Sequence, residues 1–383
     1  MEPTESKDQR HERRYPDKYN NEEDRKSEEK QKDANISRDI ELQNGNSWLQ
    51  RTRQGNSAVK NRCQITHELR FTEKLQGLYS ARFSKSGEII AAGFGSGAIQ
   101  MRNGGTGELI ATLKSGLEIS MPVMCCRFNP VQKEIFYASS ACGSIFMCNT
   151  YTKEFSRFIF ELKNEVNTID ISTTGDYLVS GGKDAIVRLY DARNTKLILQ
   201  YKRNEDLIES KATNFHRMRI FASRFHHEYP NLIITGGWDD TVRIWDIRVP
   251  TGSIRVIKGP HICGDAIDIR ETRILTGSWV VRDSLQIWDL MSAKLIETIN
   301  PQNRSSTLNG EFLYAVQYLD GDPYGDLILT GGSGTGALEV ISLKEKKVMG
   351  SIGVNKPIFT IDSHQTTIIF GGIDSVLRLG DYN

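Results

Sequence analysis

Four cysteines of this chain lie close together in the sequence and are the first candidates for chemistry. Cys125, Cys126, Cys142 and Cys148 suggest a zinc site, because thiolates are common zinc ligands. Their spacing contains no C-x-x-C pair, and the adjacent Cys125 and Cys126 must point to opposite faces of a strand. We therefore expect buried structural thiols and no metal site.

Two other motifs could support catalysis or ligand binding. The glycine-rich segment 331–336 is similar to a phosphate-binding loop, but such a loop needs a following helix, and the pattern of 337–342 predicts a strand. The run His226-His227-Glu228 contains metal-ligand residue types, but it falls in a predicted loop, where a solvated turn is expected. No Ser/His/Asp set occurs at a known spacing. We therefore expect no catalytic residues, no cofactor and no metal.

The elements that would position such residues are short strands. Residues 233–248 contain two apolar stretches that alternate at period two, a Gly-Gly-Trp-Asp turn and a closing Trp-Asp pair. We expect the Gly-Gly pair to lie in the turn and to supply positive φ angles. Related copies recur at steps of 40 to 55 residues, aligned on one position at the end of each second strand. These positions are Ala92, Ser139, Ser180, Thr235, Thr276, Thr330 and Phe370.

This pattern resembles the WD-repeat β-propeller family. The resemblance implies an all-β fold with seven four-stranded blades, and a platform that binds proteins or peptides. The copy ending in Tyr190-Asp191 aligns without a gap with the copy ending in Trp245-Asp246. Copies one, two and six are degenerate. The Gly-His pair that usually precedes a first strand is largely missing and is approached only at His261, so the usual His–Asp network is in doubt for most blades.

The chain divides into two regions by composition. Residues 62–383 are predicted to form the propeller, with strand 64–71 joining the last blade and closing the ring. Residues 1–61 carry 13 Lys/Arg and 13 Asp/Glu and few apolar residues, which predicts a disordered charged tail. Within it, residues 36–49 are either a short docking motif or a plain linker.

Charge and cysteine usage narrow the class of partner. The net charge of +1 gives no electrostatic reason for nucleic-acid binding. Six cysteines are ordinary intracellular usage, and neither a signal peptide nor an 18-residue apolar run is visible. We expect a monomeric propeller within a complex, in the cytoplasm or nucleus, without a membrane partner.

Three groups of residues are candidates for the site. On the face that carries the turns between second and third strands, we expect partner contacts from Trp238, Trp279, Lys183 and Asp240. The alternative is that each Trp packs over a neighbouring blade. Long insertions at 203–216 and 300–311 should emerge on the same face.

The second group lies on the first, innermost strands, near the channel of the ring. It consists of Arg82, Arg127, Arg224, Asp170, Asp268 and Asp362. These side chains are expected to form ion pairs between blades, and the alternative is a site for a charged peptide tail. Because such pairs are expected to be exposed to solvent, each should contribute roughly 0–1 kcal/mol.

The third group is on the opposite face, where two successive blades end in Asp191-x-Arg193 and Asp246-x-Arg248. This double Asp-x-Arg box resembles substrate receptors of cullin-RING ubiquitin ligases, and the resemblance implies that both arginines dock the propeller onto a ligase adaptor. The alternative is that each arginine closes its own turn. A non-catalytic scaffold is the leading interpretation, a ligase receptor the second, and an enzyme with a site at the channel mouth a remote third.

Overall fold

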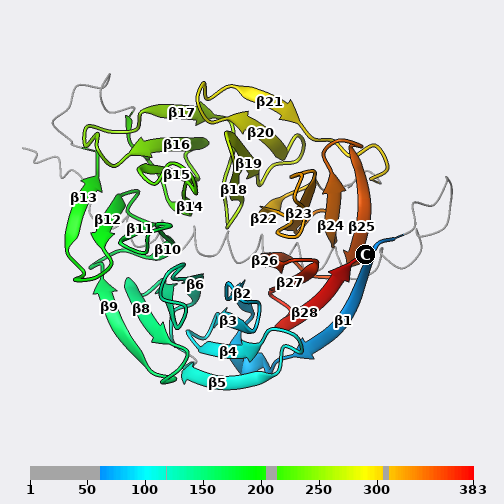
Figure 1. The fold of residues 1–383 in the computed structure, drawn as a ribbon, viewed down its shortest axis with the longest axis horizontal. Helices are drawn as coiled ribbons and strands as arrows, with labels where there is room; N and C mark the ends of the chain where they lie inside the picture. The colour runs from blue at the N-terminus through cyan, green and yellow to red at the C-terminus, as the bar shows by residue number, and fades with distance from the viewer. Residues whose placement is uncertain (1–60, 118, 204–213, 305–309) are drawn as a thin grey trace, which may run out of the picture. The chain divides into compact units, whose positions relative to one another are not determined.

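Seven four-stranded antiparallel blades form a closed ring in the computed structural model (Figure 1). The structure describes residues 61–117, 119–203, 214–304 and 310–383. The predicted all-β, seven-bladed propeller is confirmed. The predicted tail, apart from Asn61, lies outside the described residues, as do parts of both long insertions.

Each blade runs outward from the ring axis in the order of its strands. Blade one is β2 (Leu78–Phe83), β3 (Ile89–Phe94), β4 (Ile99–Asn103) and β5 (Leu109–Lys114). Blade two is β6 (Val123–Phe128), β7 (Ile135–Ser140), β8 (Ser144–Asn149) and β9 (Phe155–Phe160). Blade three is β10 (Val166–Ile171), β11 (Tyr177–Gly182), β12 (Val187–Asp191) and β13 (Leu197–Tyr201). Blades four and five are β14 (Ile220–Phe225), β15 (Leu232–Gly237), β16 (Thr241–Asp246) and β17 (Arg255–Lys258); β18 (Ile267–Arg270), β19 (Arg273–Gly277), β20 (Leu285–Asp289) and β21 (Leu295–Thr298). Blade six is β22 (Leu313–Tyr318), β23 (Leu327–Gly332), β24 (Ala337–Ser342) and β25 (Lys347–Gly353).

Blade seven combines the two ends of the described chain. Its strands are β26 (Ile358–His364), β27 (Thr367–Gly372), β28 (Val376–Tyr382) and, outermost, β1 (Cys63–Arg70), which follows β28 in the sheet. The β1–β28 ladder is antiparallel and runs from the pair Cys63/Tyr382 to the pair Arg70/Val376. A strand contributed from the other end of the chain covers an edge of β28 that would otherwise be open to pairing with another molecule. A short 3-10 turn, η2 (Glu73–Leu75), leads into blade one.

The glycine pairs do not lie where the sequence pattern placed them. Gly236 pairs with Val242 inside the β15–β16 ladder, so the second strand continues two residues beyond Thr235. Positive φ occurs later in the turn, at Asp240 (φ 55°). Gly237 is required for space instead, because a Cβ there would lie 2.2 Å from the carbonyl oxygen of Arg219. The prediction that these glycines supply positive φ is therefore wrong.

The core lies between blades, because each sheet packs both of its faces against neighbours. Leu78 and Phe94 of blade one, for example, share a buried cluster with Ile369 and Leu377 of blade seven. Each such side chain contributes about 1.5–3 kcal/mol on burial. Among the described residues, no helix is long and apolar enough to cross a bilayer.

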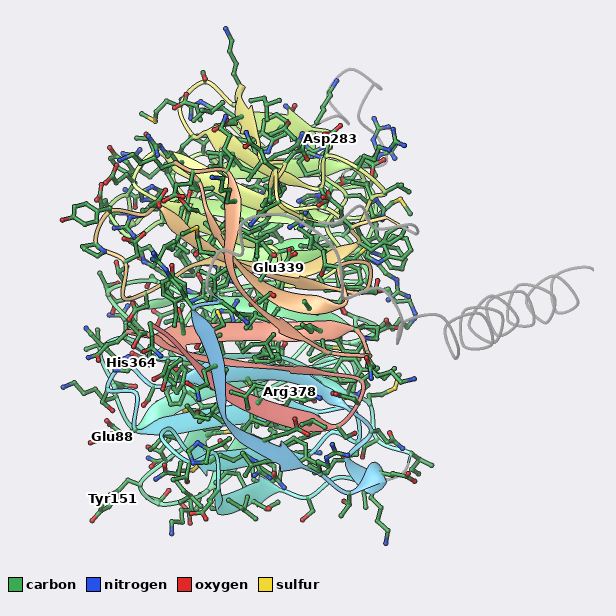
Figure 2. All side chains as sticks on the ribbon, turned by 90° about the vertical axis from the view of Figure 1, so that its right-hand side faces the viewer. Glu88, Tyr151, Asp283, Glu339, His364 and Arg378 are labelled. Atoms are coloured by element: carbon green, nitrogen blue, oxygen red, sulfur yellow. The ribbon has the colours of Figure 1, made fainter. Side chains whose placement is uncertain are left out.

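The turns separate onto two faces of the propeller. The top face carries the turns between second and third strands and the connections to the next blade; the bottom face carries the remaining turns. Seen edge-on in Figure 2, Glu88 and Tyr151 from bottom-face turns and His364 at the end of β26 lie on one side, and Asp283 from a top-face turn lies on the other.

Candidate functional site

The innermost strands share a local irregularity that builds the central site. In six of the seven blades, the second residue of this strand has no partner across the ladder, which is a one-residue β-bulge. A bulge re-aims the side chain that it carries. The bulged residues are Tyr79, Met124, Asn167, Phe221, Tyr314 and Phe359. In blade five the strand β18 begins late, and Asp265, in the loop before it, takes the corresponding place.

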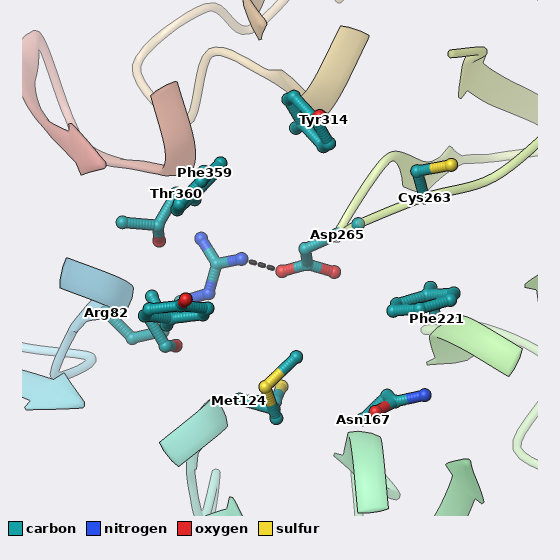
Figure 3. Close-up of a pocket in the computed structure, with 13 residues that line it drawn as sticks. Arg82, Met124, Asn167, Phe221, Cys263, Asp265, Tyr314, Phe359 and Thr360 are labelled. Atoms are coloured by element: carbon teal, nitrogen blue, oxygen red, sulfur yellow. Dashed lines mark ion pairs between the residues drawn. The ribbon is translucent and has the colours of Figure 1, made fainter. Parts of the chain in front are cut away.

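These seven residues line one cavity of about 250 Å³ at the top end of the channel, which we call the axial cup. Figure 3 shows aromatic rings and Met124 arranged around it, with the guanidinium of Arg82 and the carboxylate of Asp265 meeting in the middle. The cup is therefore concave, largely apolar at its walls and ionic at its floor. This combination is typical of small binding sites in proteins.

An arc of aromatic rings leads from the cup to the top surface. Tyr79 and Phe359 have ring centroids 5.3 Å apart, and Phe359 and Tyr314 are 5.4 Å apart in a T-shaped arrangement. Tyr314 in turn lies 6.4 Å from Trp279. Trp279 is 38% exposed, so the arc ends in a side chain available to a partner.

Arg82 and Asp265 line the floor of the cup, and three arginines, Arg82 included, cluster around Asp265. Arg127 donates from Nη2 to both carboxylate oxygens of Asp265, at 2.8 and 2.9 Å. Arg224 Nη2 lies 2.7 Å from the same carboxylate, and Arg82 is also ion-paired with it. These side chains come from blades one, two, four and five, so the cluster ties distant blades together across the axis.

The prediction that the ion pairs of the channel are exposed to solvent is wrong for this cluster. The side chains of Arg82, Arg127, Arg224 and Asp265 are only 9%, 10%, 12% and 16% exposed. Burial lowers the pKa of Arg82, and burial together with nearby Arg127 lowers the pKa of Arg224 to about 10. Arg224 still carries its charge at neutral pH. Because a buried charge without a partner is strongly destabilising, each guanidinium depends on its carboxylate partner.

The three predicted channel aspartates have a different role from Asp265. Each accepts a backbone N–H bond from the innermost strand of the next blade. Asp170 accepts from Phe225 at 2.6 Å, Asp268 from Tyr318 at 2.8 Å, and Asp362 from Phe83 at 2.7 Å. Asp170 also lies 3.3 Å from Arg127, and Asp362 lies 3.7 Å from Arg82. These carboxylates therefore join neighbouring blades.

The four predicted top-face residues are not equivalent. Trp238 is half-buried, and its ring stacks on Phe221 of the cup at 5.2 Å. Lys183 pairs with Glu165 at 2.7 Å, and the exposed Asp240 bonds His261 at 2.7 Å. Within this set, the structure brings Trp238 and Trp279 to the wall of the cup, through Phe221 and Tyr314 respectively.

On the bottom face, Arg193 and Arg248 adopt the same geometry in adjacent blades. The Nε and Nη2 atoms of Arg193 donate to Asp191 at 3.1 and 2.9 Å, and those of Arg248 donate to Asp246 at 2.8 and 2.6 Å. The side-chain bond from Arg193 lowers the pKa of Asp191 to about 2. Both arginine side chains remain exposed, at 67% and 69%. Each fork thus closes its own turn while its outer edge faces solvent.

A complete hydrogen-bonded network in blade four was missed at the sequence level. Trp245 Nε1 donates to Thr235 Oγ1 at 2.8 Å, and that oxygen lies 2.7 Å from His216 Nε2. His216 Nδ1 lies 3.0 Å from Asp239. Because Thr235 accepts from Trp245, its proton is free for Nε2, which assigns a neutral His216 that donates to Asp239. The sequence feature that could have revealed this network is a histidine 19 residues before Thr235, at the end of the long insertion.

The pKa values in this network agree with that assignment. Burial lowers the pKa of His216. Burial alone would raise the pKa of Asp239, but the bond from His216 and the other donors lower it to about 2. Asp265 was missed for a related reason: it lies in a loop three residues before Asp268, outside the strand pattern. The sequence feature that could have revealed Asp265 is a carboxylate at a position that is mostly aromatic in the other blades.

The residues first considered for chemistry are not assembled into a reactive centre. Within the described ranges, no group of three or more His, Cys, Asp or Glu could hold a metal ion. Cys125, Cys126 and Cys148 are buried, but the prediction of a buried thiol is wrong for Cys142, which is exposed in a turn. At the cup itself, burial raises the pKa of Cys263 to about 12, so its thiol stays protonated.

Comparison with known proteins agrees with the geometry of the best-formed blades. Residues 156–191 and 213–246 match the family described as WD domain, G-beta repeat. The two stretches end with the third strands of blades three and four, at Asp191 and Asp246. No curated protein matches the chain.

Proposed function

We propose that this chain, a member of the WD-repeat β-propeller family, is a non-catalytic scaffold whose top face binds a protein or peptide partner. The observation that carries the proposal is the axial cup with its aromatic arc to Trp279. A concave apolar site that continues into an exposed Trp is typical of a recognition surface, because Trp is enriched among residues that dominate binding energy.

Apolar side chains in other top-face connections extend this surface. Leu117, Ile119 and Met121, between blades one and two, are 64%, 94% and 48% exposed. Leu162, between blades two and three, is 73% exposed. Their burial under a partner would add to the affinity supplied by the cup.

The partner class is inferred from the net charge and from the way in which the channel carboxylates are bound. A net charge of +1 favours a protein over a nucleic acid. The carboxylates at the floor are held by arginines and backbone amides, which supports binding over catalysis. All six cysteines are free thiols, which supports a reducing compartment, the cytoplasm or nucleus.

The test is affinity purification of partners with the wild-type chain and with Trp279→Ala. We expect partners recovered by the wild type to be lost or reduced at least tenfold with the variant. The matched control is Tyr151→Ala, an aromatic residue that is 86% exposed in a bottom-face turn, and it should retain them. Equal recovery with Trp279→Ala, in a chain of unchanged thermal stability, contradicts the proposal.

A second candidate concerns the bottom face. Arg193 and Arg248 present the same exposed guanidinium, held in place by Asp191 and Asp246, from two neighbouring blades. A pair of pre-oriented forks suits carboxylate or carbonyl acceptors and favours docking onto a ubiquitin-ligase adaptor. Co-purification of a cullin adaptor with the wild type, and its loss with Arg193→Ala/Arg248→Ala, would support this. An adaptor that is never recovered, or that the double variant retains fully, would exclude it.

A further inference from the structure

We propose that the axial cup receives one uncharged aromatic side chain of the partner, a phenol in preference to a plain phenyl ring, and that it excludes cationic side chains. This inference rests on the proposed function, because it assigns the chemistry of the group that the top face binds. It follows from the size of the cup, the charges at its floor and one buried donor.

The size of the cup fits a single side chain. Its volume of about 250 Å³ is below the roughly 300–1,000 Å³ of sites for drug-sized ligands. The walls include the rings of Tyr79, Phe221, Tyr314 and Phe359 and the thioether of Met124. Aromatic rings pack well against one another in edge-to-face and offset arrangements, and a thioether adds a favourable contact with a ring. These walls therefore fit an inserted aromatic ring.

Aromatic walls alone would also suit an alkylammonium group, because a cation is attracted to the face of a ring. The charges at the floor decide against it. Three guanidinium groups, of Arg82, Arg127 and Arg224, converge on Asp265 there, and all four side chains are at least four-fifths buried. Asp170 and Asp362, which also pair with Arg127 and Arg82, are held by backbone N–H groups of the next blade. A cation entering the cup would approach buried positive charges whose nearest carboxylate is already occupied.

An anionic side chain is disfavoured by the same cluster. Asp265 is already ion-paired with Arg82, Arg127 and Arg224, so a second carboxylate would lie beside it and compete for guanidinium groups that are in use. Burial of that second charge would also cost solvation free energy that no free guanidinium offsets. The floor therefore selects a neutral group.

One donor at the floor favours a neutral acceptor. Arg82 lines the cup, its side chain is 9% exposed, and its Nε atom is buried with no hydrogen-bond partner among the described residues. A buried donor left without an acceptor is unfavourable, because it has lost its bonds to water and gained none in the protein. The oxygen of a tyrosine side chain would satisfy Nε while its ring packs on the walls, which a phenylalanine ring would not do.

The test uses the full chain labelled with ¹³C-methyl methionine, because the methyl group of Met124 reports from inside the cup. Met124→Leu identifies the resonance. The probes are p-cresol as the tyrosine side chain, toluene as the phenylalanine side chain, tetramethylammonium as the cation and propionate as the anion. We expect p-cresol to shift the Met124 signal saturably, toluene to bind at least threefold more weakly, and both ions to leave it unmoved at tenfold higher concentration.

A wall variant and an outside control make the assignment specific. Tyr314→Ala should raise the dissociation constant of p-cresol at least fivefold, while the signal of buried Met349 shows that the fold is kept. Tyr324→Ala, on an 88% exposed residue of the bottom face, should leave binding unchanged.

Two results would overturn the inference. Tighter binding of tetramethylammonium than of p-cresol at Met124 would make the cup a cation site. The absence of a saturable shift with any probe would mean that the cup does not receive side chains. Neither result decides the scaffold proposal, which the purification with Trp279→Ala tests. Conversely, retention of partners by Trp279→Ala would contradict the scaffold proposal without changing probe binding in the cup.

Discussion

Asp265→Asn is the most direct perturbation of the axial cluster. Asparagine keeps the size of the side chain but removes its charge, and it presents an amide where three guanidinium groups converge. Two unit charges about 4 Å apart attract by about 4 kcal/mol at an effective dielectric constant of about 20. Three such attractions are opposed by repulsion among the arginines and by their lost solvation. Removal of one partner from a buried ionic group costs about 3–5 kcal/mol, which we expect here.

The assay is urea unfolding followed by Trp fluorescence, with the slope m compared between variants so that only changes in midpoint are interpreted. Lys183→Gln is the control, because Lys183 is 50% exposed and its pair with Glu165 is expected to contribute about 0–1 kcal/mol. Addition of Arg224→Gln to Asp265→Asn should recover part of the loss, since one uncompensated charge is removed. A loss below about 1 kcal/mol for Asp265→Asn, or no recovery in the double variant, would refute the account of the floor as mutually dependent buried charges.

Three further predictions follow from the sites. Burial lowers the pKa of His216, so the unfolded chain takes up a proton first as the pH falls below about 6.5. The free energy of unfolding of the wild type should therefore decline from pH 7 to 5, whereas that of His216→Asn should be lower at pH 7 and change less. Parallel pH profiles of the two proteins in urea unfolding would contradict this. Trp279→Ala should lower the free energy of unfolding by less than Trp238→Ala, for which we expect about 2 kcal/mol, because Trp279 is the more exposed ring although it also packs on Phe312. Equal losses in urea unfolding would show that both rings are packing residues to the same degree. Arg248→Ala should leave the thermal midpoint unchanged and raise the pKa of Asp246, because the side-chain hydrogen bond from Arg248 is the main cause of the lowered pKa. An unchanged pKa of Asp246 in an NMR titration would show that Arg248 is not held against Asp246 in solution.

The fold could be predicted because it depends on short-range patterns in the sequence. Strands that alternate apolar residues at period two, with turn residues between them, predict four-stranded blades wherever they repeat at the WD period. The copy 233–248 was sufficient to align the others, including the degenerate ones. The positions of Arg82, Arg127 and Arg224 on innermost strands followed from the same alignment.

The site was less accessible from the sequence, because its members are joined only by closure of the ring. Arg127 and Asp265 are 138 residues apart, and no local pattern pairs them. The bulges that turn Tyr79 and Phe359 into the cup depend on how each innermost strand pairs with its neighbour. The two Trp residues looked equivalent in the alignment, but only the neighbours from other blades make Trp238 half-buried and leave Trp279 exposed.

The sequence by itself determined the blades and their number, since these depend on period and turn chemistry, and its resemblance to WD-repeat propellers indicated the faces on which the turns lie. The tertiary structure alone decided which charges meet on the axis and which aromatic rings face the cup. The physical reason is that buried ion pairs and ring contacts act over a few ångströms, and seven blades bring residues to that distance only when the ring is closed.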